Sequence, residues 1–262
     1  MQDPQDHLSP DDDDLVRRSY KRYFETGHYD RRYPGPNPDM WRRIRGHLGP
    51  DAHLIDFGCG SGRYLMQAQG HVARAAGFDV SPAALALVRA RAEARGWHDL
   101  AVLGPDPAML SDHVSRHGRA DVVICMFGVL GHIAGPADRQ AALAQMRGAL
   151  KPETGRLIVS VPNVKRRFRA EQRRAGSGAY GLVRYERALD GETVELDYQL
   201  FDEAGLRREL TEAAFTVRHV GCESVLPENW LLTHRTARQT DRLLSRLCPL
   251  RWCYGLYAEA SC

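Results

Sequence analysis

The sequence predicts an α/β fold: a doubly wound, mostly parallel β-sheet with helices on both faces. Between residues 53 and 161, short apolar runs alternate with segments of helical length, and the links between them are short. This alternation is typical of βαβ units, whose right-handed crossovers cover both faces of a parallel sheet. The first apolar run ends in a glycine-rich turn, as expected where a strand passes directly into a helix.

Five strands and three helices are expected in this region. The strands are 53–57, 75–80, 100–103, 121–126 and 156–161. The helices are 63–69, 83–95 and 136–150. Ser81 and Pro82 support the start of the second helix, because Ser caps a helix and Pro fits its first position.

The flanking segments are expected to be less regular. Before the sheet, a helix over 15–25 leads into a proline-rich loop and a helix over 40–48, with Asn37 or Asp39 as its cap. After it, the pattern predicts a basic run, one or two short strands, a helix, a strand, an insertion and a final strand. These segments are 164–174, 184–200, 202–214, 215–224, 225–251 and 252–258.

The composition is that of an ordinary globular protein. The 262 residues are 43% hydrophobic and 26% charged, and area scaling allows about 73% of the extended surface to be buried. The net charge of +3 does not by itself indicate a nucleic-acid partner. No run of 18 apolar residues occurs, and the start MQDPQDHLSPDDDD lacks the regions of a signal peptide. We therefore expect a cytoplasmic protein without a transmembrane segment.

Six cysteines are present, and no two form a CxxC pair. We expect free thiols in a reducing compartment and neither zinc nor another metal. The cysteines are Cys59, Cys125, Cys222, Cys248, Cys253 and Cys262.

The sharpest motif is the turn DFGCGSG at residues 56–62. Its three glycines permit a tight backbone that a ligand can approach closely, and the following helix N-terminus offers free N–H groups. A dinucleotide fingerprint needs a glycine at position 63, where the chain has Arg63, and no P-loop motif occurs. Taken alone, the turn also fits a tight strand–helix corner.

Asp79 is the second candidate site residue. It ends the second expected strand, seventeen residues beyond Gly62. In an α/β sheet, the carboxyl ends of these two strands open on one crevice, where a carboxylate can accept hydrogen bonds from two ribose hydroxyls. The alternative is a solvent-exposed aspartate at a strand end.

With these motifs in place, residues 53–161 resemble the class I S-adenosylmethionine-dependent methyltransferases. The resemblance rests on HLIDFGCGSGRYL, GFDVSPAAL, DVVICMFGVLGHI and LKPETGRLIVSVPN, which occur in the family's order. The last departs from the usual L-x-P-G-G by one extra turn residue. The resemblance implies a Rossmann-like, seven-stranded sheet with an antiparallel last strand, which accounts for 215–224 and 252–258.

The resemblance also implies how the chain is organised. A single methyltransferase domain would span residues 1–262. It would consist of a mobile tail (1–14), an N-terminal helical lid (15–50), a cofactor-binding core (51–161) and inserted acceptor-binding segments with the last strands (162–262).

By this resemblance, the cofactor is S-adenosylmethionine, held by the glycine loop, the strand ends and the lid. Asp106 would bind the adenine amino group, with Asp112 as the alternative, and Arg32 would reach the cofactor carboxylate, with Arg31 as the alternative. The implied cofactor-binding residues are Tyr29, Arg32, Asp56, Gly58, Cys59, Gly60, Gly62, Asp79, Val80, Asp106 and Phe127.

The acceptor site is expected outside the core. His132 is the candidate catalytic base, because it follows the fourth strand at the crevice, although a histidine there also orients loops; His28 and His234 are alternatives. A short amphipathic helix, 238–247, would roof the pocket or touch a membrane interface. The candidate acceptor-binding residues are Tyr180, Tyr185, Tyr198 and Trp230, with Trp252 nearby.

The leading hypothesis is a methyltransferase that acts on O, N or S of a small molecule. A transfer-RNA methyltransferase of the wobble-uridine type is the first alternative, because the basic run KRRFRAEQRR at 165–174 can attract phosphates. DRQAALAQMRGALKP and DYQLFDEAGLRREL resemble that class, but also ubiquinone-pathway and natural-product enzymes. A cofactor-binding regulatory protein without turnover is the second alternative.

Overall fold

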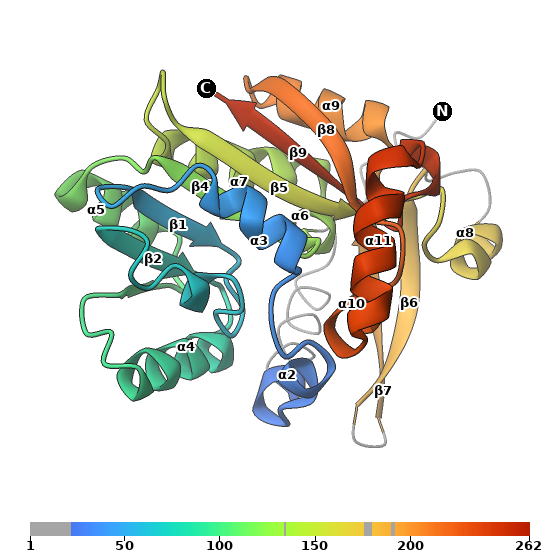
Figure 1. The fold of residues 1–262 in the computed structure, drawn as a ribbon, viewed down its shortest axis with the longest axis horizontal. Helices are drawn as coiled ribbons and strands as arrows, with labels where there is room; N and C mark the ends of the chain where they lie inside the picture. The colour runs from blue at the N-terminus through green and yellow to red at the C-terminus, as the bar shows by residue number, and fades with distance from the viewer. Residues whose placement is uncertain (1–21, 134, 176–179, 190–191) are drawn as a thin grey trace, which may run out of the picture.

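The computed structural model describes residues 22–133, 135–175, 180–189 and 192–262. Its centre is a seven-stranded sheet in the order β3-β2-β1-β4-β5-β9-β8 (Figure 1). Strand β9 runs antiparallel to both of its neighbours, β5 and β8, so the predicted antiparallel last strand is confirmed. The strands are β1 His53–Phe57, β2 Arg74–Phe78, β3 Ala101–Leu103, β4 Val122–Cys125, β5 Arg156–Pro162, β8 Thr216–Ser224 and β9 Gly255–Ser261.

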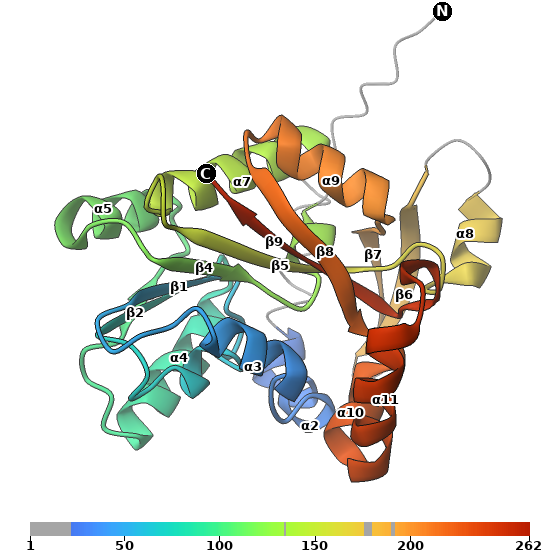
Figure 2. The same ribbon diagram turned by 45° about the horizontal axis from the view of Figure 1, so that its top comes forward.

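Helices cover both faces of the sheet, as Figure 2 shows. One face carries α3 Pro38–Arg45 and α4 Pro82–Ala94, which bury residues such as Ile44 and Leu85 against the strands. The other carries α5 Ala108–His117, α7 Pro136–Ala149 and α9 Glu203–Glu212, whose apolar residues join the largest core cluster. Burial on both faces explains why the central strands read as continuous apolar runs.

Shorter elements gather beyond the carboxyl ends of the parallel strands (Figure 1). A hairpin of two antiparallel strands, β6 and β7, contacts α8 and α6 in this region. The elements are α2 His28–Arg32, η1 Leu65–Gln67, α6 Val129–His132, α8 Arg169–Ala175, β6 Leu182–Leu189, β7 Glu192–Gln199, α10 Glu228–Thr233, α11 Arg235–Leu247 and η2 Leu250–Trp252.

The structure corrects several expected elements. The helix expected over 63–69 is only the 3₁₀ turn η1, because its residues are buried against both α3 and α4 and Gly70 interrupts the segment at φ 77°. Helix α5 was not expected, and β9 begins three residues later than predicted. Residues 22–25 are helical, whereas the tail 1–14 and the helix expected at 15–21 lie outside the described residues.

Side-chain caps fix the starts of α3 and α4, which lie on the same face of the sheet. Asn37 Oδ1 accepts a hydrogen bond from Asp39 N–H at 3.0 Å, so Asn37 rather than Asp39 caps α3. Ser81 Oγ accepts one from Ala84 N–H at 3.3 Å, as the sequence predicts for α4. Both helices are thereby anchored beside the carboxyl ends of the strands.

Candidate active site

Three glycines shape the loop after β1. Gly58, Gly60 and Gly62 have left-handed backbones, with φ of 74°, 53° and 81°. A Cβ at Gly58 would overlap the Val129 side chain, and one at Gly60 would lie 3.4 Å from Phe24. The loop is therefore closely covered by α6 and by the N-terminal segment, and glycine is required at Gly58 on both counts. Cys59 is buried beside it, which raises the pKa of its thiol.

Asp79 joins this loop to the end of β2. Its Oδ2 accepts a hydrogen bond from Gly60 N–H at 2.8 Å, and its Oδ1 accepts one from Ser81 N–H at 2.8 Å. Burial raises the pKa of Asp79, although these hydrogen bonds oppose the shift. The carboxylate is thus fixed between the ends of β1 and β2, and the neighbouring Val80 is exposed.

Asp56 is a second buried acid, one residue before the end of β1. Burial and the nearby charge of Asp79 raise the pKa of Asp56 to about 7, against a hydrogen bond from Leu65 N–H and the charge of Arg63. A carboxyl group with this pKa is about half ionised at neutral pH. A cation that binds beside Asp56 will therefore shift it to the charged form.

The N-terminal segment is tied to the loop by Asp30, which the sequence did not indicate. Asp30 Oδ1 accepts a hydrogen bond from the Ser61 hydroxyl at 2.7 Å, and its Oδ2 forms an ion pair with Arg91 at 2.5 Å. The predicted alternatives, Arg31 and Arg32, are exposed instead. The Arg32 guanidinium carbon lies 5.6 Å from the centroid of the Tyr33 ring, so the predicted role of these arginines stays a prediction.

Aromatic rings pack over the loop. The Tyr29 ring centroid lies 5.0 Å from that of Phe24 and 6.1 Å from that of Phe127, and Tyr33 lies 4.6 Å from Phe127. Burial raises the pKa of Tyr29, so its hydroxyl stays protonated. The structure thus brings the predicted residues Tyr29 and Phe127 together.

Phe127 itself has a left-handed backbone, with φ of 64°. This conformation costs a non-glycine residue about 1–3 kcal/mol, and such strain clusters at functional sites. The Phe127 N–H donates a hydrogen bond to the Ser160 hydroxyl at 2.7 Å, which holds the ring at the carboxyl ends of β4 and β5.

A buried ion pair beside Phe127 joins the loop to α10. The Arg63 guanidinium approaches the Glu228 carboxylate to 3.1 Å, and the two side chains are only 4% and 11% exposed. The Arg63 guanidinium carbon lies 4.0 Å from the centroid of the Phe127 ring. Among the described residues, no nitrogen of this guanidinium has a hydrogen-bond partner of good geometry, and neither has Glu228 Oε1. Because buried polar groups are rarely left unpaired, the pair is available to a polar ligand.

Glu223, near the end of β8, belongs to the same cluster. Burial and the charge of Glu228 raise the pKa of Glu223, while a hydrogen bond from Ser160 and the charges of Arg63 and Arg167 lower it. Its Oε1 likewise lacks a hydrogen-bond partner within the described part of the chain. Two carboxyl groups and two guanidinium groups therefore meet at the carboxyl end of the sheet.

One arginine of the basic run, Arg167, belongs to this cluster. The Arg167 guanidinium carbon lies 4.8 Å from the Tyr254 ring centroid and 5.9 Å from that of Tyr198. Lys165, Arg166 and Arg169 remain exposed. Arg167 thus forms part of the wall of the site rather than of the solvated surface.

Of the four residues expected to bind the acceptor, Tyr185 and Tyr198 lie near the cluster. Tyr198 is buried and stacks on His132 with ring centroids 4.1 Å apart, and Tyr185 lies 5.9 Å from Tyr198. Tyr180 and Trp230 are 62% and 51% exposed. About half or more of each of these two side chains therefore faces solvent, and their predicted role in acceptor binding stays a prediction.

The other predicted acids and bases are dispersed. Asp106 follows β3 and accepts a hydrogen bond from Ala108 N–H at 2.9 Å, whereas Asp112 lies on α5 and pairs with Arg116 at 3.6 Å. Position thus favours Asp106 over Asp112. His28 and His234 are exposed, at the start of α2 and the N-cap of α11, while His132 closes α6.

Residues 55–157, most of the parallel half of the sheet, match the family model described as a methyltransferase domain. This segment of the chain is therefore similar to known methyltransferase domains. The strand order and the position of the glycine loop agree with the resemblance stated above.

Two curated methyltransferases resemble this domain. A dTDP-3-amino-3,6-dideoxy-alpha-D-glucopyranose N,N-dimethyltransferase of Streptomyces fradiae is 28% identical over 118 residues, 44% of this chain and 42% of the relative. Methyltransferase ungE' of Aspergillus campestris is 29% identical over 125 residues, 47% of this chain and 36% of the relative. The chain thus aligns with less than half the length of the curated relatives it matches.

Solved structures share the fold over nearly the whole chain. The 1,6-didemethyltoxoflavin-N1-methyltransferase of Burkholderia thailandensis, bound to 1,6-didemethyltoxoflavin and S-adenosylhomocysteine, has a TM-score of 0.63 at 18% identity and covers 99% of this chain and 92% of its own. CalS10, an amino pentose methyltransferase of Micromonospora echinaspora bound to S-adenosylmethionine, has a TM-score of 0.55 at 17% identity and covers 86% and 90%. Both likenesses concern the fold.

Arg63, Glu223 and Glu228, like Asp30, are site residues that sequence reasoning missed. Arg63 enters the sequence argument only as the residue that excludes a dinucleotide fingerprint. Glu228 lies in the insertion, in VLPENWLL, where an acid among apolar residues is the one available signal. Their burial depends on how α10 packs against the loop, which local sequence does not encode.

Within the described ranges, no group of three or more His, Cys, Asp or Glu side chains is placed to hold a metal ion. None of the helices there combines the length and the apolarity that crossing a bilayer requires. All six cysteines are free thiols.

Proposed function

We propose that this protein transfers a methyl group from S-adenosylmethionine to an O, N or S nucleophile of a small molecule by in-line displacement. Among these three elements, we propose nitrogen as the nucleophile. The observation that carries the proposal is the loop after β1, where Gly60 N–H meets the Asp79 carboxylate beside the buried Asp56. The glycine backbone lets a ligand approach closely. The two neighbouring carboxyl groups suit a ligand that has an ammonium group and ribose hydroxyls.

The residues present fit that cofactor. Asp56 would hold its ammonium group, Asp79 its ribose hydroxyls, and Asp106 its adenine amino group, while Phe127 and Tyr29 cover it. When bound, the cofactor supplies a methyl group that the positive sulfur already activates. The backbone of Gly58, Cys59, Gly60 and Gly62 and the exposed Val80 would line the rest of its surface.

Arg63, Glu223 and Glu228 would hold the acceptor beside Phe127. In-line displacement needs the nucleophile about 3–3.5 Å from the methyl carbon, in line with the leaving group and with little water. The ion pair offers fixed, buried hydrogen-bonding groups for positioning, and the rings of Tyr33 and Phe127 exclude water. Tyr198 and Tyr185 extend the same wall.

Two observations favour nitrogen as the nucleophile. The relatives from S. fradiae and B. thailandensis are named as N-methyltransferases. In addition, the raised pKa of Glu223 suits a group that accepts a proton from an ammonium acceptor, which must lose it before it can attack. His132 is the alternative base, and its stacking on Tyr198 also suits a residue that orients the β6–β7 hairpin.

We extend the proposal to the segments before and after the residues that match the methyltransferase model. Residues 15–50 would act as the lid over the cofactor, and 162–262 would supply the acceptor site. The six free thiols suit a cytoplasmic enzyme.

Calorimetry with S-adenosylhomocysteine tests the cofactor site. We expect the wild type to bind it, Asp79→Ala to weaken binding at least about 10-fold, because the carboxylate that meets the ribose is lost, and Asp112→Ala to leave it unchanged. The Asp112 control removes the same charge from α5, and thermal melts check that both variants fold. Undiminished binding by Asp79→Ala would refute the ribose role, and no binding by the wild type would refute the function.

Turnover separates this function from its alternatives. S-adenosylhomocysteine formation, measured by mass spectrometry, is expected with members of a panel of small amines and amino sugars. Transfer RNA as the productive acceptor, with binding that falls steeply with salt, would replace the small molecule. Cofactor binding without product from any acceptor would favour the regulatory alternative.

A further inference from the structure

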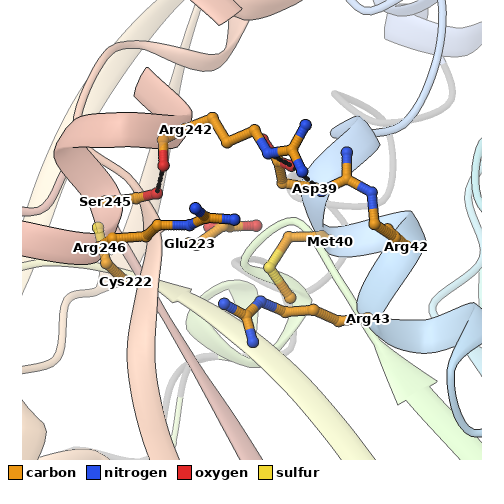
Figure 3. Close-up of a pocket in the computed structure, with 9 residues that line it drawn as sticks. All are labelled: Asp39, Met40, Arg42, Arg43, Cys222, Glu223, Arg242, Ser245 and Arg246. Carbon is orange, nitrogen blue, oxygen red and sulfur yellow. Dashed lines mark hydrogen bonds and ion pairs between the residues drawn. The ribbon is translucent and has the colours of Figure 1, made fainter. Parts of the chain in front are cut away.

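A pocket of about 260 Å³ lies between α3 and α11, outside the cofactor loop. Figure 3 shows Arg43 reaching into it from α3, and Arg242 reaching across from α11 towards Asp39. Its lining includes four arginines and two acids: Arg42, Arg43, Arg242, Arg246, Asp39 and Glu223. The pocket therefore carries an excess of positive charge.

The arginines differ in how far they are already engaged. Asp39 accepts a hydrogen bond from Arg42 at 2.6 Å and lies 3.8 Å from Arg242. The Arg43 guanidinium carbon lies over the Tyr257 ring, 4.8 Å from its centroid. Within the described part of the chain, Arg246 has neither an ion pair nor a hydrogen bond. Arg43 and Arg246 thus retain free donors for an anion.

Both helices that carry these arginines are anchored. In α3, Met40 and Ile44 are buried against the sheet. In α11, the buried Asp241 accepts hydrogen bonds from Val225 N–H at 2.8 Å and Leu226 N–H at 2.7 Å, which fixes the helix to the end of β8. The guanidinium groups therefore project from fixed supports on opposite sides of the pocket.

The pocket shares one residue, Glu223, with the proposed acceptor site. Glu223 lines the pocket and also interacts electrostatically with Arg63 and Glu228. Its carbonyl oxygen accepts a hydrogen bond from the Asn37 side chain at 3.2 Å, at the start of α3. The pocket and the proposed acceptor site therefore adjoin at Glu223.

We propose that this pocket binds a phosphate group of the methyl acceptor, which is therefore a phosphorylated small molecule. Guanidinium groups bind phosphate oxygens through paired, charge-assisted hydrogen bonds, and arginine is the preferred residue for that purpose. The proposal rests on the proposed function, because it assigns one end of the same acceptor.

Inorganic pyrophosphate, titrated into the whole protein by calorimetry, is the direct probe. We expect wild type and Arg235→Gln to bind it equally, and Arg246→Gln to bind it about 10-fold more weakly. Arg235 is the matched control, since it is an exposed arginine of α11 that does not line the pocket. Equal binding by all three proteins, or none by the wild type at millimolar concentration, would overturn the phosphate assignment.

S-adenosylhomocysteine binding to the same three proteins separates the two proposals. Normal binding of it without pyrophosphate binding would overturn the pocket assignment alone. Failure of the wild type to bind it would overturn the proposed function. Phosphatidylcholine vesicles with and without phosphatidic acid form the last arm. Arg246-dependent sedimentation with the acidic vesicles, but no pyrophosphate binding, would assign the charge to a lipid surface and overturn a soluble acceptor.

Discussion

Two arginine–glutamate ion pairs in this molecule are buried to nearly the same extent but differ in how many hydrogen bonds they make. Arg139 of α7 and Glu209 of α9 are 5% and 12% exposed, and Arg63 and Glu228 are 4% and 11% exposed. Arg139 Nε donates to both Glu209 oxygens, at 2.8 and 3.0 Å, and its Nη1 donates to Ile133 O at 3.2 Å. Arg63 approaches Glu228 once, at 3.1 Å, without a hydrogen bond of good geometry to any described residue.

The difference shows what each pair is for. A buried charge is tolerated when its hydrogen bonds are complete, as they are where α7 meets α9. The incomplete pair lies at the carboxyl end of the sheet, beside the strained Phe127, where a ligand can complete it. We infer that the first pair stabilises the fold and the second binds a ligand.

The largest expected effect is on stability, at the complete pair. Arg139→Met would leave the Glu209 carboxylate buried without its partner and lower the free energy of unfolding by about 3–5 kcal/mol. Urea denaturation measures this change. The kcat/KM of the folded enzyme should stay within about twofold of wild type, because the pair lies among helices on one face of the sheet. A large loss of kcat/KM would break the comparison.

The next effect is on activity, at the incomplete pair. Replacing both partners, Arg63→Met with Glu228→Gln, leaves no stranded charge, so the free energy of unfolding should change by about 1 kcal/mol or less. The value of kcat/KM should fall about 100-fold, since the groups that position the acceptor are gone. Steady-state kinetics with the acceptor identified by the panel measure this. A destabilised but fully active double variant would assign the pair to the fold instead.

These two pairs also mark the limit of what the sequence predicts. The starts of β1 and β5 and the tight glycine turn were predicted correctly, because apolar runs and glycine turns are local signals. Helix α5 was missed, and only Leu110 and His113 of its residues are buried. The Arg63–Glu228 contact joins the first loop to a helix in the last quarter of the chain. Only tertiary packing brings these residues together.

Asp56 is a third buried ionisable group, and its ionisation predicts that cofactor binding depends on pH. Burial raises the pKa of Asp56 to about 7, so its carboxylate forms as pH rises through that value. Because the ionised form attracts an ammonium group, the affinity for S-adenosylhomocysteine should rise about 10-fold from pH 6 to pH 8. Calorimetry at several pH values measures the rise, and Asp56→Asn should remove it. The same pH dependence in Asp56→Asn would assign the titration to another group.

The smallest effect tests whether a missing hydrogen bond always marks a ligand site. His53, at the start of β1, is buried, and its Nδ1 has no hydrogen-bond partner among the described residues. Its Nε2 lies 3.1 Å from Nε2 of His113, and this pair lies at the amino end of the sheet, opposite the site. Burial and nearby positive charge lower the pKa of both histidines to about 4.

The sign of the resulting pH dependence follows from linkage. The unfolded chain takes up protons on these histidines below pH 6.5, whereas the folded protein resists until about pH 4, so stability falls as pH drops between these values. His113→Leu removes one of the two groups and should reduce the drop in melting temperature from pH 7 to pH 5 by about 2–4 °C. Thermal melts measure it, and His98→Leu, on an exposed turn, is the control. S-adenosylhomocysteine affinity should not change in His113→Leu. If the affinity of His113→Leu does change, a missing hydrogen bond at the amino end of the sheet also affects ligand binding. Position at the carboxyl end would then no longer distinguish a binding pair from a structural one.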